Sequence, residues 1–118
     1  MSSSIEWVTI PQWHTISFVG LSKARGLLRV RLKGETMFLG HAAKGGLGPR
    51  LGAYRSPKGS GKNHHAGRLI YEHRAEIEMQ IAVMNKPAEQ ILRLLDTELR
   101  KTQPEWNVPN GHRRGHPS

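Results

Sequence analysis

Arg50 is the residue whose type and position best suit chemistry on a phosphate. It lies in the stretch Leu47 to Tyr54, where Pro49 near the start predicts a short helix. A guanidinium there can bind two phosphate oxygens at once and stabilise the charge that develops during phosphodiester hydrolysis. Hydrolysis also needs a general base, and His41 and Tyr54 are the histidine and the tyrosine nearest to Arg50 in the sequence. Arg50, His41 and Tyr54 are therefore the candidate catalytic residues.

The charge distribution points to a polyanionic partner. The net charge is +9, and no acidic residue occurs between His41 and Arg68. Glycines are frequent in this basic segment, so backbone N–H groups can approach phosphates while lysines supply the opposite charge. We expect nucleic acid as the partner, with DNA favoured over RNA. The candidate nucleic-acid contacts are Lys44, Arg55, Lys58, Lys62, His64, His65 and Asn107.

Composition excludes several other classes of protein. The chain has 118 residues, enough for one small domain, and its 36% hydrophobic residues are typical of a globular protein. It lacks cysteine, which excludes disulfides and thiolate metal sites. No stretch reads as a membrane span or a signal peptide, so we expect a cytoplasmic protein without membrane contact. The segment around Lys62 lacks the spacing of a phosphate-binding loop, which argues against an NTPase. Nothing indicates the oligomeric state.

Two stretches with alternating apolar residues predict strands. In Gly26 to Lys33, apolar residues alternate with cationic ones, and the Lys33-Gly34 turn predicts a hairpin whose return strand, from Thr36, stops at Gly40. Glu76 to Met84 predicts a third strand with one buried face. The stretch from Trp7 to Phe18 is interrupted by proline and predicts an irregular edge strand or a packing arm.

One clear helix follows the third strand. Pro87 opens it, and an apolar stripe that includes Ile91, Leu95 and Leu99 predicts packing against the sheet. We therefore predict an α/β (α+β) fold, with a small central sheet of about three strands flanked by helices. The expected organisation is an N-terminal arm over residues 1–20, a domain over 21–107 and a basic flexible tail over 108–118.

The order of the motifs resembles the GIY-YIG nuclease superfamily. Gly26-Leu27-Leu28 and Phe38-Leu39-Gly40 are similar to the paired strands of that family. The stretch around Arg50 is similar to its helix with the catalytic arginine, and Tyr54 matches a His-or-Tyr position four residues later. Gln103-Pro-Glu-Trp-Asn107 is similar to its closing motif. The resemblance covers about Leu21 to Asn107, and it implies a GIY-YIG-like domain in which Asn107 has a structural or phosphate-positioning role.

The resemblance also implies a divalent cation held by an acid of the last helix. The family's metal-binding Glu lies about nine residues before the proline of the closing motif, and here that position is Leu95. A one-residue deletion after the helix would bring Asp96 to the position instead. Asp96 is the first choice and Glu98 the second, and loss of the ligand is a third possibility. If the protein is active, Mg²⁺ or Mn²⁺ is the expected cofactor.

The two tyrosines of the family motifs are replaced. Their positions hold Leu28 and Phe38, neither of which can donate or accept a proton. His41 is the foremost substitute base. Two functions follow. One is a divalent-metal-dependent endonuclease that hydrolyses DNA phosphodiester bonds, with Arg50 stabilising the phosphate. The alternative is a catalytically degraded GIY-YIG-fold module that binds DNA or RNA.

Overall fold

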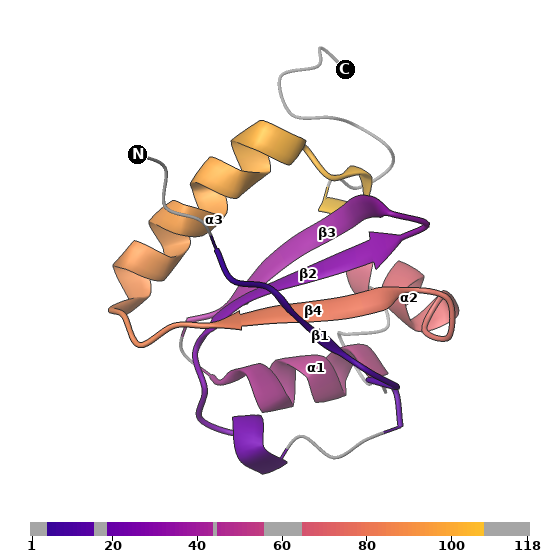
Figure 1. The fold of residues 1–118 in the computed structure, drawn as a ribbon, viewed down its shortest axis with the longest axis horizontal. Coiled ribbons are helices and arrows are strands. Elements are labelled where there is room, and N and C mark those ends of the chain that lie inside the picture. Colours follow the sequence, from indigo (N-terminus) through magenta and orange to yellow (C-terminus); the bar gives the residue numbers. More distant parts are fainter. Residues whose placement is uncertain (1–4, 16–18, 44, 56–64, 108–118) are drawn as a thin grey trace.

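The computed structural model describes residues 5–15, 19–43, 45–55 and 65–107. The elements in chain order are β1 (Val8–Ile10), η1 (Val19–Leu21), β2 (Gly26–Leu32), β3 (Glu35–Ala42), α1 (Leu47–Arg55), α2 (His65–Glu72), β4 (Glu78–Val83), α3 (Ala88–Thr102) and η3 (Glu105–Asn107). The strands form one antiparallel sheet in the order β1-β4-β2-β3 (Figure 1). The α+β fold is confirmed. The sheet has four strands and not about three, because β1, within the stretch for which an irregular edge strand or a packing arm is predicted, pairs with β4.

The hairpin of β2 and β3 is built on a primed turn, as its sequence predicts. Lys33 and Gly34 both have positive φ, at 53° and 82°, which matches the twist of the two flanking strands. The return strand does not stop at Gly40 but continues to Ala42, opposite Gly26. A side chain at position 40 would lie 2.8 Å from the ring of Phe38, so this glycine makes room for an aromatic side chain and does not end the strand.

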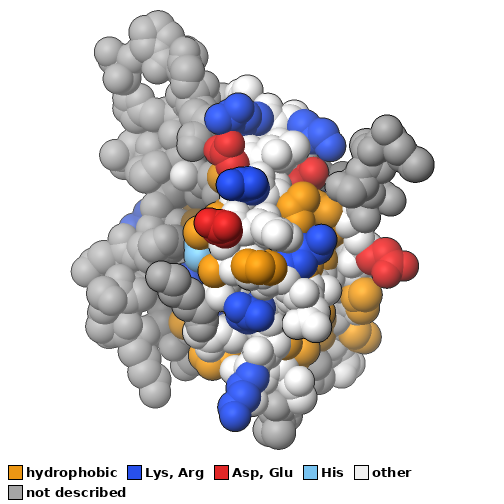
Figure 2. Space-filling model, turned by 90° about the vertical axis from the view of Figure 1, so that its left-hand side faces the viewer, with side chains coloured by type: hydrophobic (Ala, Val, Ile, Leu, Met, Phe, Trp, Pro, Cys, Tyr) orange, Lys and Arg blue, Asp and Glu red, His pale blue; other side chains and the backbone are white. Residues whose placement is uncertain are grey.

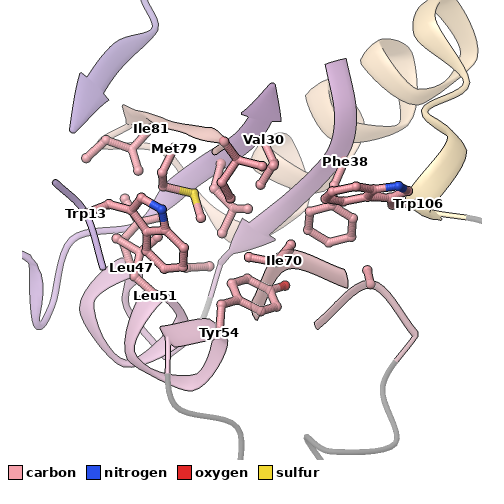
Figure 3. Close-up of a cluster of buried hydrophobic side chains, with 14 residues drawn as sticks. Trp13, Val30, Phe38, Leu47, Leu51, Tyr54, Ile70, Met79, Ile81 and Trp106 are labelled. Atoms are coloured by element: carbon pink, nitrogen blue, oxygen red, sulfur yellow. The ribbon is translucent and has the colours of Figure 1, made fainter. Parts of the chain in front are cut away.

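Two hydrophobic clusters cover the two faces of the sheet. Leu27 and Leu28 are adjacent in β2 and fully buried, one in each cluster, as the alternation of side chains in a strand requires. In Figure 1, α1 and α2 lie on one side of the sheet and α3 lies on the other. Figure 3 shows the larger cluster, on the α1 and α2 side, where Trp13 and Met79 pack beside Leu47. The sheet is thus the middle layer of three.

The other face of β4 is buried as well, unlike the prediction of one buried face. Gln80 is 7% exposed; its amide N–H donates to Thr9 Oγ1 (3.0 Å), and its carbonyl oxygen accepts from Arg29 Nε (2.7 Å). The Arg29 guanidinium lies 4.5 Å from the centre of the Trp7 ring. Burial lowers the pKa of Arg29, and the nearby charge of Arg31 lowers it further. The cationic face of the hairpin is therefore partly covered by the N-terminal strand and α3.

Within the described residues, no helix combines the length and apolar character that crossing a membrane requires.

Candidate functional site

A pocket of about 310 Å³ runs along the edge of the sheet at β3. It is bounded by α1 and the start of α2 on one side and by α3 and η3 on the other. Its lining combines a few polar groups with apolar and aromatic walls, as is usual for small-ligand sites. The lining residues are Phe38, Leu39, Gly40, His41, Arg50, Tyr54, Ala66, Leu95, Leu99, Trp106 and Asn107. The three candidate catalytic residues therefore meet in one pocket.

Arg50 and Tyr54 form a pair on α1. They are four residues apart, so their side chains emerge from the same face of the helix. Arg50 is exposed, and its guanidinium donates a hydrogen bond to the Tyr54 hydroxyl. Tyr54 is buried, and its ring meets that of Phe38 edge to face at 5.8 Å. In Figure 3 the hydroxyl is directed toward the side on which Phe38 and Trp106 lie. The hydroxyl of the buried Tyr54 side chain thus holds the exposed Arg50 guanidinium in place.

Burial raises the pKa of Tyr54, and the nearby charge and hydrogen bond of Arg50 oppose this effect. The phenol therefore stays neutral near pH 7, where it can accept a hydrogen bond from Arg50 and donate one to a ligand. A neutral phenol with a raised pKa is a poor general base.

His41 is half-buried at the end of β3, and one of its ring nitrogens is already engaged. The backbone N–H of Ala43 donates to His41 Nδ1 at 3.2 Å, so Nδ1 carries no proton and the neutral ring has its proton on Nε2. Burial lowers the pKa of His41, and the positive charge of Arg50 lowers it further. His41 thus enters the pocket as a neutral hydrogen-bond donor. To act as a base through Nε2, the ring would first have to give up its bond to Ala43.

Asn107 is held by the backbone of β3. The N–H of Leu39 donates to Oδ1 and the Nδ2 group donates to the carbonyl of Leu39, each at 2.9 Å. The chain reaches this position because Gln103 ends α3 in a left-handed conformation, with φ of 45°. The amide therefore joins η3 to the open edge of β3 and closes the pocket beside Trp106. This geometry favours the structural role for Asn107 among those the sequence suggested.

The predicted metal ligands lie outside the pocket lining. Asp96 pairs with Arg100 at 3.0 Å, and Glu98 pairs with Lys101 at 3.4 Å. All nine acidic residues of the chain belong to the described part, and none of them lines the pocket. Nor does any cluster of three or more His, Asp or Glu side chains form among the described residues. Mg²⁺ prefers carboxylate and other oxygen ligands. The arginine, histidine, tyrosine and amide groups that are present do not fit such an ion.

Leucines occupy the wall where an acid was expected. The count back from Pro104 lands on Leu95, and Leu95 does line the pocket, together with Leu99 one turn later. The apolar stripe of α3, which predicts packing against the sheet, also forms this wall of the pocket. Trp106 also lines the pocket, a position that no sequence motif predicts. Of the two positions where the resemblance expects tyrosine, Leu28 is fully buried in the core and Phe38 lines the pocket.

The structure describes only some of the predicted nucleic-acid contacts. Lys44, Lys58, Lys62 and His64 lie outside the described residues, as does the side chain of His65 at the start of α2. Arg55 is half-buried at the end of α1. Figure 2 shows that the face covered by α3 carries interspersed basic, acidic and hydrophobic side chains. Since this face is of mixed charge, it is not the basic surface that the sequence predicts.

No family model matches the sequence, and no curated protein matches it. The crystal structure of the GIY-YIG N-terminal endonuclease domain of UvrC from Thermotoga maritima, bound to its catalytic magnesium ion, is similar. It is 25% identical, with a TM-score of 0.56, over 75% of this chain and 88% of that one. A tyrosine-to-phenylalanine variant of the same domain is 26% identical, with a TM-score of 0.55, over 75% and 87%. The chain therefore has a GIY-YIG fold, in a divergent form.

Proposed function

We propose that this protein binds nucleic acid, with DNA favoured over RNA, and that Arg50 contacts a backbone phosphate at the β3 pocket. The observation that carries the proposal is the convergence of Arg50, His41 and Tyr54 in one pocket of a nuclease fold. An arginine fork and two neutral donors form a set of groups that suits a phosphate. The net charge of +9 supports the same partner. A cytoplasmic location stays a prediction from composition.

The test is a binding titration with a matched control. Arg50→Ala removes a cation that lines the pocket, whereas Arg93→Ala removes an exposed cation of α3 outside it. Binding of fluorescein-labelled DNA is followed by anisotropy at low salt, with RNA in parallel. We expect Arg50→Ala to lose about 1.5–3 kcal/mol of binding free energy, as for a hydrogen bond to a charged group. Arg93→Ala should bind nearly like the wild type. Equal losses of binding free energy in both variants would mean that net charge alone drives binding. They would refute the proposal that nucleic acid binds at the pocket.

Metal-dependent DNA cleavage is a second candidate. It is favoured by the similar UvrC domain, whose crystal structure holds a catalytic magnesium ion. Nicking of supercoiled plasmid in Mg²⁺ or Mn²⁺, measured beside Arg50→Ala, tests it. Nicking by the wild type and not by Arg50→Ala would support cleavage at this pocket. Absence of nicking together with Arg50-dependent binding would favour the degraded binding module.

A further inference from the structure

We propose that the β3 pocket binds the phosphate of a single nucleotide unit without a metal ion. Arg50 and His41 would hold the phosphate, and Leu95 and Leu99 would pack against the attached sugar or base. The proposal rests on the proposed function, because it concerns how the same pocket holds nucleic acid. The crystal structure of the similar UvrC domain holds a catalytic magnesium ion, whereas the site proposed for this chain holds its ligand without a cation.

The first step of the argument is the composition of the lining. A divalent cation would have to exchange tightly held water for protein oxygens, and the wall contributed by α3 offers only the carbons of Leu95 and Leu99. Asp96 lies next to this wall in the sequence, but its carboxylate is 3.0 Å from Arg100. Because every acidic residue of the chain is described, the segments outside the description contain no Asp or Glu side chain that could supply the missing ligand.

The second step is that the side chains of the pocket can neutralise the charge of a phosphate and donate hydrogen bonds to it without a metal ion. Arg50 is a permanent cation held in place by Tyr54, and His41 presents an N–H because its other nitrogen accepts from Ala43. A phosphate that meets an arginine and neutral donors needs no bridging cation.

The third step is the size and the apolar wall. A volume of about 310 Å³ is at the small end of ligand pockets, which span about 300–1,000 Å³. Such a pocket can take one nucleotide unit, but not a duplex. Phe38, Leu95, Leu99 and Trp106 supply carbon surface on which a sugar or a base can pack. An apolar wall opposite a cation therefore suits an amphipathic ligand better than it suits a hydrated ion.

Binding with and without divalent cation tests the inference. Labelled single-stranded DNA is titrated into wild type and Arg50→Ala in EDTA, and again in Mg²⁺ or non-catalytic Ca²⁺ at matched ionic strength. We expect affinity in EDTA to equal or exceed that in Mg²⁺, since the cation competes for phosphates. Arg50-dependent binding that is about tenfold tighter in Mg²⁺ would overturn the metal-free site and leave the proposed function standing. Binding that does not depend on Arg50 would overturn both.

A gain-of-metal variant gives a second readout that does not depend on nucleic acid. Leu95→Glu places a carboxylate on the pocket wall beside Trp106, whereas Leu92→Glu places one at a 40% exposed position one turn earlier on α3. Tb³⁺ emission sensitised by tryptophan reports an ion near that ring. We expect saturable emission from Leu95→Glu and none from the wild type or Leu92→Glu, with thermal unfolding confirming that each variant is folded. Saturable emission from the wild type that Mg²⁺ competes away would overturn the proposal.

Discussion

The side-chain amide of Asn107 forms two hydrogen bonds with the backbone of Leu39, each 2.9 Å long. Among the described strands β3 lies at the edge of the sheet, so the outward N–H and C=O groups of Leu39 face no neighbouring strand of that set. A single side chain thus satisfies both groups and fixes η3, with Trp106, beside the pocket.

Asn107→Ala should therefore destabilise the fold. It leaves two partly buried backbone groups without this partner, at a cost of about 1–3 kcal/mol in unfolding free energy. Chemical denaturation measures the change, and Asn85→Ala, at an exposed position before α3, is the control. If Asn107→Ala were as stable as the control but bound nucleic acid poorly, the amide would be a phosphate contact and not a structural link.

Tyr54→Phe isolates the hydroxyl that holds Arg50. The ring and its edge-to-face contact with Phe38 are kept, so stability should fall by no more than about 1.5 kcal/mol. Affinity for nucleic acid should fall because the guanidinium loses its tether, although less than in Arg50→Ala. Tyr71→Phe, at an exposed tyrosine of α2 outside the pocket, should change neither quantity. Unchanged DNA affinity in Tyr54→Phe would show that Arg50 needs no positioning.

The sequence predicted that Arg50, Tyr54 and His41 lie close together, but it also predicted an acidic metal ligand from α3 beside them, which the pocket lacks. Arg50 and Tyr54 are one helical turn apart, and His41 lies one residue before the end of the preceding strand, so local sequence was enough to place the three together. Whether an acidic side chain lines the pocket depends on how α3 is rotated about its own axis. A count of residues alone could not decide whether Leu95 or Asp96 faces the pocket. The tautomer of the neutral His41 ring depends on a hydrogen bond from the backbone N–H of Ala43, two residues away. No sequence motif indicates this contact.

The fold was predictable where periodicity was strong. The hairpin turn and α3 followed from Lys33-Gly34 and from the apolar stripe after Pro87. Strand β1 is three residues long, too short for a clear alternation, and its pairing with β4 is a long-range contact. The sequence does not predict the burial of Gln80 for the same reason. Arg29 and Thr9, which form hydrogen bonds with the Gln80 side chain, are distant from it in the chain.

The lowered pKa of His41 predicts a pH dependence of stability with a definite sign. The folded protein binds a proton at this ring less readily than the unfolded chain does. The contribution of the neutral His41 ring to the unfolding free energy is therefore fully present above the unfolded-state pKa of about 6.5. It is lost as the pH falls from that value toward the lower pKa of the folded state. His41→Asn keeps an acceptor for the Ala43 N–H but cannot titrate. Between about pH 7 and pH 5, the wild type should lose more unfolding free energy than His41→Asn, and parallel curves would contradict the shift.

The basic segment outside the described residues should determine the salt dependence of binding. Lys58→Ala combined with Lys62→Ala removes two cations from the acid-free stretch. Affinity should fall for all DNA sequences alike, and the slope of log Kd against log salt should flatten by about one to two units. Unchanged affinity at low salt would show that this stretch is only a connector.

Two glycines should respond to alanine with opposite signs. At Gly26, a Cβ would lie 2.0 Å from the carbonyl oxygen of Ala82 in the paired strand β4, and backbone atoms cannot move aside cheaply. Gly26→Ala should therefore cost about 3 kcal/mol or more, as overpacking against a rigid neighbour does. At Gly52, in α1, a Cβ meets nothing within 4 Å, so Gly52→Ala should stabilise the helix by up to about 1 kcal/mol. Thermal unfolding of the two variants checks both signs. A tolerant Gly26→Ala would mean that β2 and β4 are not as closely paired as the structure shows, and the sheet that positions His41 and the pocket would have to be redrawn.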